Sequence, residues 1–335
     1  MNPMFSRTLK ALCTLAAVAL LSACGGASST VDPFVATRVI AFGDGFNYVN
    51  ASGAGLSTVQ TGETDITIAG RIAATRYGIV VKDVATGPAL AATGGFSYAT
   101  ASATVSDVVT QINTYLTSAG GSVAKKDLII ISVGNWDVKA NAEGTATQSI
   151  DTATTNLVTA IQRLTNAGAE HVVVMPSINM ARTPWAKALA NTNAISLADI
   201  QKLSITTANL PALTSFNVLL STKLSAVYTQ DRKPVLLLDQ SSVFNNFAGY
   251  SDTDGTTRII NGSGLAITAD TGLYVPVCLS PTAFAGCTLA NLAGGASSTD
   301  YQSYVFADNI NLTPLVNRFL ADNMAYTMRA LGWAP

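Results

Sequence analysis

The sequence predicts an α/β fold, a three-layer sandwich in which a mainly parallel sheet is flanked by helices. Short apolar runs rich in Val, Ile and Leu recur along the chain and are bounded by turn residues. Stretches with apolar residues at helical spacing separate these runs. Such alternation is typical of parallel strands that are joined by crossover helices and buried on both faces.

The first residues have the pattern of a bacterial export signal. Arg7 and Lys10 precede an apolar run at residues 11–21, which is shorter than the roughly 20 residues that span a bilayer. The run ends in Leu21-Ser22-Ala23-Cys24-Gly25, which resembles the lipobox of bacterial lipoproteins. This resemblance implies a signal peptide over residues 1–23. A plain secretory signal followed by an incidental cysteine is the alternative.

The lipobox resemblance also implies acylation of Cys24, for example with palmitate, as the first residue of the mature chain. Each buried methylene of an acyl chain contributes about 0.8 kcal/mol, so the chain would be held on a membrane. Gly25 replaces the Asp that retains such lipoproteins at the inner membrane, which implies the outer membrane. Residues 24–33 are mostly small and polar and fit a flexible tether. The folded domain is expected over residues 34–335.

Charge and cysteine content exclude several classes of function. The net charge is −1, charged residues make up 12% and no run of Lys or Arg occurs, so no nucleic-acid partner is expected. Of the four cysteines, Cys13 lies in the signal and Cys24 ends the lipobox. We expect a disulfide between the other two, Cys278 and Cys287, in an oxidising compartment. A zinc site lacks ligands, because the chain has no CxxC and no cluster of Cys with His. No cofactor is expected.

Strands, helices and loops can be placed from periodicity and turn residues. Strands are expected at residues 38–42, 127–133, 171–175 and 234–238. Helices are expected around residues 108–116, at 150–164 with Gly168 as a stop signal, in part of 203–228 with an interruption at Pro211, and after Thr313-Pro314. Residues 47–75 and 241–300 are rich in Gly, Ser, Thr, Asn and Asp, and we expect loops or small hairpins there.

Two motifs follow predicted strands, where open parallel sheets place their sites. The first strand leads into Gly43-Asp44-Gly45-Phe46, and a second segment covers residues 96–104. They resemble the Gly-Asp-Ser-Leu and Asn-Tyr-Ala-x-Gly-Gly-Ala blocks of the GDSL, or SGNH, ester hydrolases. The resemblance puts Gly45 at the position of the family's nucleophilic serine. It puts Ser102, or its neighbour Ala101, at the oxyanion-hole glycine.

Two further motifs continue the resemblance in the same order. Gly134-Asn135-Trp136-Asp137 is similar to the family's Gly-x-Asn-Asp block, so Trp136 stands where the oxyanion-binding asparagine should be. Asn135 is one residue away, and a shift of one residue turns a side chain to the opposite side. Residues 304–314 resemble the Asp-x-x-His-x-Thr-Pro block, with Asp308 retained and the histidine replaced by Asn311.

Weaker similarities extend the resemblance over residues 39–333 and imply an SGNH-hydrolase-like sheet. They are Met175-Pro176, Thr183-Pro184 and Gly332-Trp333.

The replaced residues are those that carry the chemistry of ester hydrolysis. That reaction needs a hydroxyl nucleophile, a base that titrates near neutral pH, and donors for the oxyanion. Residues 43–50 contain no Ser, Thr or Cys. Asn311 does not titrate, so it cannot act as a general base. The chain's one histidine, His171, starts a predicted strand and is expected at the edge of the sheet opposite the site.

Two functions fit these residues. The first is a catalytically inactive envelope lipoprotein with a binding or structural role, whose Trp136 either fills the former oxyanion pocket or contacts a small apolar, ester or sugar ligand. A purely structural role would leave the site packed shut. The second is an ester hydrolase that uses Ser97 or Ser102 as nucleophile and Lys139 or an aspartate as base.

The three retained aspartates have their own alternatives. Asp44, Asp137 and Asp308 could converge as a metal site or an acid–base pair. The simpler interpretation is that Asp44 and Asp308 brace a turn or cap a helix.

Overall fold

The computed structural model describes residues 34–51, 53, 55–56, 66–84, 90–205, 215–228, 234–247, 258–260, 266–268, 276–278, 292 and 304–335. Residues Phe34–Pro335 form one compact unit. The predicted signal peptide, Cys24, the tether and Cys287 lie outside the described residues. Among the helices that are described, none combines the length and hydrophobicity needed to cross a membrane.

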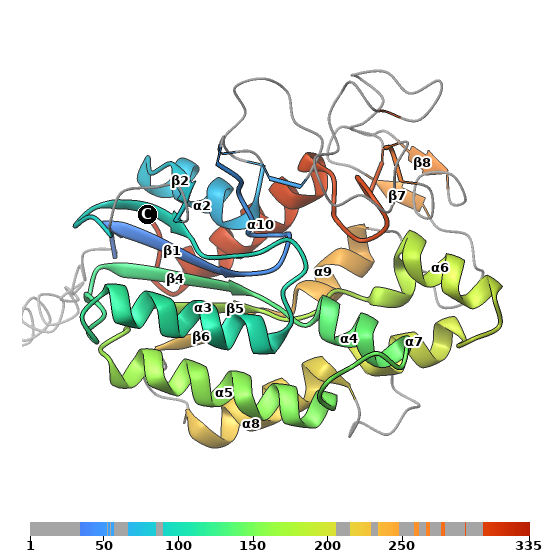
Figure 1. Cartoon of the computed structure of the whole chain (residues 1–335). Helices are drawn as coiled ribbons and strands as arrows, with labels where there is room; N and C mark the ends of the chain where they lie inside the picture. The colour runs from blue at the N-terminus through green and yellow to red at the C-terminus, as the bar shows by residue number, and fades with distance from the viewer. Residues whose placement is uncertain are drawn as a thin grey trace, which may run out of the picture. The chain divides into compact units, whose positions relative to one another are not determined.

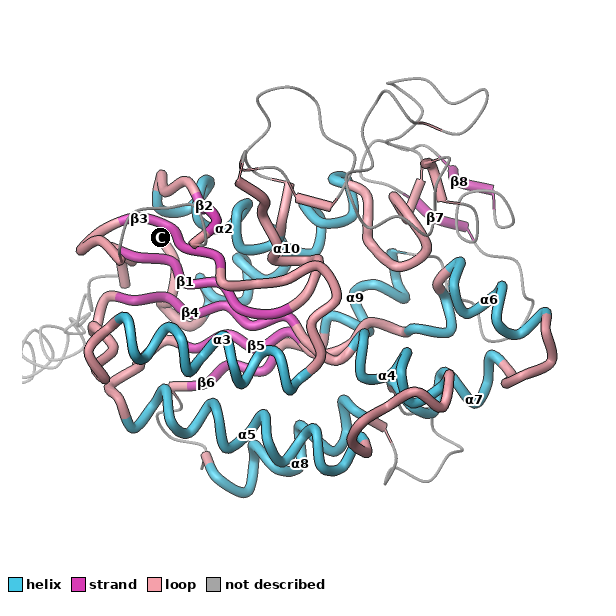
Figure 2. The backbone as a smooth tube through the Cα atoms, in the orientation of Figure 1, coloured by secondary structure: helices cyan, strands magenta, loops and turns pink. Residues whose placement is uncertain are grey.

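A six-stranded sheet in which every neighbouring pair is parallel forms the centre of the unit (Figure 2). The strand order is β2-β3-β1-β4-β5-β6. The predicted fold class is therefore confirmed. The strands are β1 (Arg38–Gly43), β2 (Val81–Asp83), β3 (Gly94–Ser97), β4 (Asp127–Ser132), β5 (Val172–Met175) and β6 (Val235–Leu237).

The two central strands supply the middle of the hydrophobic core. Residues 39–42 of β1 and 128–131 of β4 are completely buried, and Val39 pairs with Leu128 in the parallel register. Both faces of the sheet must therefore be covered, which explains why these strands are apolar runs without alternation.

Helices cover the two faces of this sheet. In Figure 1, α3, α5 and α8 lie on one side of the strands, and α2 and α10 lie on the other. Neighbouring helices pack as α3 with α5, α5 with α8, and α2 with α10. Their bounds are α2 (Ile68–Tyr77), α3 (Val105–Ser118), α5 (Ile150–Asn166), α8 (Phe216–Val227) and α10 (Pro314–Ala330).

The helix boundary signals predicted from the sequence are confirmed. Gly168 follows the end of α5 with φ of 107°, a backbone conformation that glycine adopts readily. Thr313 is the N-cap of α10, and Pro314 is its first residue, where the missing amide hydrogen has no helical partner to lose.

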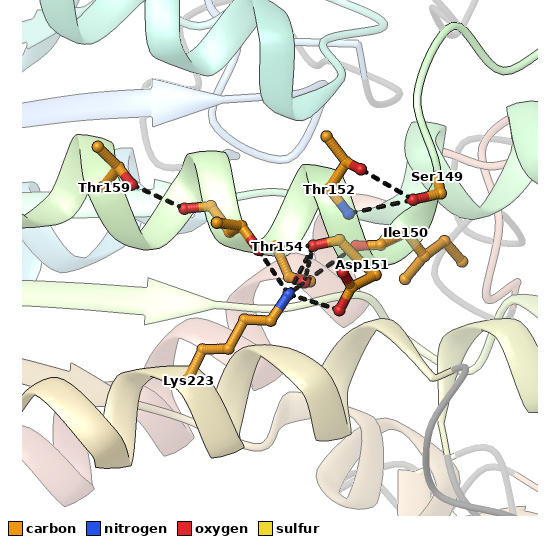
Figure 3. A network of polar contacts seen from close by, with 8 residues as sticks. Ser149, Ile150, Asp151, Thr152, Thr154, Thr159 and Lys223 are labelled. Carbon is orange, nitrogen blue, oxygen red and sulfur yellow. Dashed lines mark hydrogen bonds and ion pairs between the residues drawn. The ribbon is translucent and has the colours of Figure 1, made fainter.

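A lysine fastens α8 to the start of α5. Figure 3 shows Lys223 reaching from α8 to the first turn of α5. Its Nζ lies 2.8 Å from Asp151 Oδ1, 2.9 Å from Thr154 Oγ1 and 2.7 Å from Thr155 Oγ1. A single cation therefore binds several oxygens of the neighbouring helix.

A second group of helices follows the carboxyl ends of the strands, on the right of Figure 1. Helix α4 comes directly after β4, and η1, α6 and α7 follow β5. The sequence analysis did not anticipate α4, α6 or α9. Their bounds are α4 (Asn135–Ala142), η1 (Met180–Arg182), α6 (Pro184–Asn191), α7 (Leu197–Ser204) and α9 (Gln240–Phe247).

The prediction of loops at residues 47–75 was wrong for the last part of that segment. Helix α2 begins at Ile68, and the Thr67 hydroxyl caps it by accepting a hydrogen bond from Gly70 N. The buried face of α2 consists largely of small residues with two isoleucines, so its helical pattern is weak in the sequence. Gly78 ends the helix with φ of 65°.

Residues 241–300 also contain more structure than the loops predicted there. Helix α9 begins at Gln240 and overlaps this segment. Strands β7 (Arg258–Ile260) and β8 (Ala266–Thr268) pair antiparallel, which confirms the expectation of a small hairpin.

Strands β2 and β3 were missed because their sequences have little strand character. A Cβ atom on Gly95 would lie 2.8 Å from the carbonyl oxygen of Val80 and 2.8 Å from Val81 Cα. Glycine is therefore required where β3 meets β2, although glycine is rare in strands.

Candidate functional site

The turn after β1 begins the candidate site and needs a glycine at its first position. Gly43 has φ of 123°, and an added Cβ would overlap the backbone of Ser132 on β4. The Gln111 side chain of α3 binds both backbone polar groups of Gly43. Gly43 N donates to Gln111 Oε1 at 2.7 Å, and Gln111 Nε2 donates to Gly43 O at 3.1 Å. Gly43 and Gln111 therefore fix the path of the chain into Asp44.

Asp44 is completely buried and ties the turn to the end of β4. Its carboxylate accepts hydrogen bonds from Ser132 Oγ at 2.7 Å, Asn135 Nδ2 at 3.0 Å and Phe46 N at 3.2 Å. Burial raises the pKa of Asp44 to about 6, and these three donors limit the increase. This environment is that of a brace rather than of an exposed base.

Asn135 is a structural link between strand ends. Its Nδ2 donates to Asp44, and its Oδ1 accepts from Ser177 Oγ at 3.0 Å and from Ile178 N at 3.1 Å. The side chain therefore joins the segments that follow β1, β4 and β5. It is turned toward Asp44.

Asp137 caps helix α3. Both of its oxygens lie within hydrogen-bond distance of Val105 N, the first amide of that helix, at 3.2 and 3.0 Å. A carboxylate at a helix N-terminus is stabilised by the unpaired amides and the helix dipole. Burial, with smaller contributions from Asp44 and Asp107, nevertheless raises the pKa of Asp137 to about 7.

Asp308 organises the loop that carries Asn311. Asp308 Oδ1 accepts from Ile310 N at 2.8 Å and from Asn311 N at 2.7 Å, and Oδ2 accepts from Asn311 Nδ2 at 2.8 Å. Both side chains are buried, and burial raises the pKa of Asp308 to about 6. Asp308 thus orients the side chain at the position that the sequence resemblance assigns to a histidine.

Gly45 and Asn311 face each other directly. A Cβ atom on Gly45 would overlap Asn311 Oδ1 and would lie 2.9 Å from Leu56 Cδ1. Within the described residues, Asn311 Oδ1 is buried and accepts no hydrogen bond. The structure therefore brings together Gly45, Asn311 and Asp308, of which the sequence resemblance assigns Gly45 to the nucleophile position and Asn311 to the base position.

The serines considered as substitute nucleophiles lie in different environments. Ser97 is buried; its Oγ donates to Asn47 O at 2.9 Å and accepts from Ala99 N at 3.3 Å. Ser102 is exposed in the loop before α3, next to the half-buried Ala101. Ser97 therefore has a structural role.

Trp136 belongs to a cluster of aromatic and charged side chains that the sequence analysis did not foresee. Its side chain is buried, and Lys139 Nζ lies 5.7 Å from the centres of the Trp136 and Trp185 rings. Glu143 accepts from Lys139 Nζ at 2.5 Å and from Trp185 Nε1 at 2.7 Å. Lys139 is thus held as a cation by Glu143 and two aromatic rings.

This tryptophan cluster lies beside the Asn311 loop. The backbone amide of Trp185 donates to Asn309 O at 3.1 Å. Thr183-Pro184 begins α6, with the Thr183 hydroxyl accepting from Ala186 N at 3.1 Å. The motif that resembles the family after the third predicted strand therefore starts the helix that positions Trp185.

His171 lies at the amino end of β5, which confirms the prediction that it is at the opposite edge from Asp44 and Asn311. Its ring stacks on Phe34 with centres 3.6 Å apart and meets the edge of Trp333 at 4.9 Å. Burial lowers its pKa. Gly332-Trp333 thus packs around the histidine and not at the candidate site.

Two further expectations concern a metal site and a disulfide. Across the described part of the chain, no group of His, Cys, Asp and Glu side chains could hold a metal ion. Cys278 is buried and bridges to Leu292 through backbone pairing. Its predicted partner Cys287 is outside the described residues, so their disulfide stays a prediction.

Comparison with known proteins gives similarity to solved structures only. No protein-family model matches the sequence, and no curated protein matches it. The chain is similar to a member of the lipolytic protein G-D-S-L family from Veillonella parvula, with 11% identity, TM-score 0.41, and coverage of 88% of this chain and 97% of that one. It is also similar to a lipase/acylhydrolase from Enterococcus faecalis, with 12% identity, TM-score 0.43, and 88% and 96% coverage. The acetyl xylan esterase AlAXEase gives 14% identity, TM-score 0.44, and 87% and 98% coverage.

Proposed function

We propose that this protein is a catalytically inactive cell-envelope lipoprotein that uses the frame of an SGNH/GDSL ester hydrolase for binding or for a structural role. The observation that carries this proposal is the contact between Gly45 and Asn311. The space where a serine side chain would begin is filled by an amide that cannot accept a proton from a nucleophile. The anchor rests on the sequence at Cys24.

The tryptophan cluster supports a closed site. Trp136 and Trp185 are buried, and Glu143 neutralises the charge of Lys139. Trp136 then fills the former oxyanion position instead of presenting an open face to a sugar or apolar ligand. Of the binding and structural roles, this arrangement favours the structural one.

The alternative is an ester hydrolase with a different nucleophile. Of Ser97 and Ser102, only Ser102 remains a candidate for that role. Ser102 is exposed, whereas Ser97 is buried and uses its hydroxyl for backbone contacts. The Lys139 amine is already engaged, because it donates to Glu143 and lies over the Trp136 and Trp185 rings.

Hydrolysis of short- and medium-chain p-nitrophenyl esters by the mature chain tests this proposal. We expect a rate equal to that of buffer with a non-enzymatic protein, for the unmodified chain and for Ser102→Ala. Hydrolysis that Ser102→Ala or Lys139→Met abolishes would refute inactivity. A rate that survives both substitutions identifies a contaminating esterase, which repurification from a different host removes.

A further inference from the structure

Exposed apolar side chains gather at the amino ends of the strands, where the folded unit begins. Val35, Val80 and Leu331 have exposed fractions of 53%, 48% and 54%. Figure 1 shows the C-terminus at this same end of the sheet, beside the start of β1. We call these three residues, with the basic residues Lys125, Lys126 and Arg329, the amino-end surface.

Backbone contacts connect the parts of the amino-end surface. Phe34 N donates to Gly332 O at 2.9 Å, which places Val35 beside the segment of Leu331. Thr37 N donates to Lys126 O at 2.9 Å. Thr37 and Val80 line the same hollow, of about 410 Å³. The apolar and basic residues therefore belong to one continuous region.

The amino-end surface is basic although the whole chain has a net charge of −1. Lys126 and Arg329 are exposed. The Lys125 side chain is 83% exposed, and its partner Glu170, 3.1 Å away, is 50% exposed, so solvent screens this pair strongly. The helix dipole accounts for Arg329 in the last turn of α10, but Lys125 and Lys126 lie in a loop beyond the end of α3.

The chain that precedes the folded unit restricts what the amino-end surface can reach. Residues 24–33 separate the predicted lipidated Cys24 from Phe34, and a segment of that length spans at most about 36 Å when fully extended. An unstructured tether of this composition averages about half that distance. The edge that contains Phe34 must then stay close to the membrane.

We propose that the amino-end surface docks on the anionic phospholipids of the membrane that holds Cys24. The basic residues meet lipid phosphates, and Val35, Val80 and Leu331 meet the interface. The edge with Gly45 and Asn311 then points away from the membrane. This inference rests on the lipid anchor of the proposed function.

Lipid-borne quenching tests the orientation in the full mature chain, anchored in phosphatidylcholine vesicles with or without phosphatidylglycerol. A fluorophore is attached at Leu331→Cys, on the amino-end surface, or at Ser106→Cys, an exposed position at the start of α3 near the other edge. With phosphatidylglycerol, we expect a quencher in the lipid to quench the Leu331→Cys label several-fold more strongly than the Ser106→Cys label. The unsubstituted chain gives the background from its own cysteines.

Charge reversal supplies the matched variants. Lys125→Glu with Lys126→Glu should lower the ratio of docked to undocked protein by about 25-fold or more, since each Lys near an anionic surface contributes about fivefold. Lys187→Glu with Lys202→Glu changes the net charge equally, on α6 and α7, and should leave quenching unchanged.

Two failures can be told apart. A chain that does not float with the vesicles refutes the lipid anchor and, with it, this orientation. A chain that floats but shows equal quenching at both labels, or undiminished Leu331→Cys quenching after reversal of Lys125 and Lys126, refutes the orientation alone.

Discussion

At the scale of single residues, the three aspartates that match the family motifs are explained by structure without catalysis. Asp44 braces the turn after β1, Asp137 caps α3, and Asp308 holds the Asn311 loop. Burial raises the pKa of each carboxyl group. Each of the three carboxylates therefore has a structural role.

The raised pKa values predict that the protein loses stability as pH rises from about 4 to about 7. A carboxyl group with a higher pKa in the folded state binds a proton there that the unfolded chain has already released. Its contribution to the free energy of unfolding is complete below the unfolded pKa and is lost as pH rises through the folded one. Urea unfolding across this pH range measures the slope.

Asp137→Asn should make this slope smaller. Asparagine keeps an oxygen that can accept from Val105 N, so the cap on α3 persists, but the side chain no longer titrates. An unchanged slope in Asp137→Asn would contradict the raised pKa of this group.

At the scale of helices and strands, Lys223 shows how packing depends on contacts that no local pattern reveals. Lys223→Met keeps the length of the side chain but removes its bonds to Asp151, Thr154 and Thr155. We expect the free energy of unfolding to fall by about 1–2 kcal/mol. Lys202→Met breaks only an exposed pair with Asp199, which solvent screens, so it should change the free energy of unfolding much less. If thermal or urea unfolding gave the same loss for both variants, the Lys223 contacts would contribute no more to stability than an exposed ion pair.

The sequence predicted those elements whose pattern is local. Strands β1 and β4 are uninterrupted apolar runs, and α3 and α5 have clear apolar stripes. Strand β3 contains adjacent glycines, which are unusual in strands. Its place in the sheet depends on the close approach of β2 to Gly95, and a contact between separate segments leaves no local sequence pattern. The buried face of α2 is small and weakly patterned.

The candidate site was predictable to a similar degree. Motif order placed Gly45, Asp308 and Asn311, which the structure brings into contact. The hydrogen bonds that Asn135 donates to Asp44 and that Trp185 donates to Glu143 join side chains on separate elements, whereas Lys139 and Glu143, the C-cap of α4, are four residues apart on the same helix. Gln111, which holds Gly43, lies in the middle of a helix that looks purely structural in the sequence.

At the scale of the whole folded unit, the parallel sheet separates two edges with different chemistry. The carboxyl ends of the strands gather Asp44, Gly45 and Asn311, and the amino ends hold His171 between Phe34 and Trp333. His171, the one histidine of the sequence, lies before β5, whereas Gly45 and Asn311 follow the strands, so it has no part in the candidate site.

Labelling with a fluorophosphonate, which reacts covalently with activated serines, tests this central claim most directly. The samples are the unmodified chain, Gly45→Ser, Asn311→His and the double variant, each checked for folding by circular dichroism, with the labelled residue found by peptide mapping. We predict no label on the unmodified chain or on either single variant. The double variant shows whether Ser102 and Trp136, at the oxyanion positions of the resemblance, also have to be replaced before position 45 reacts. A label on a serine of the unmodified chain would contradict the account.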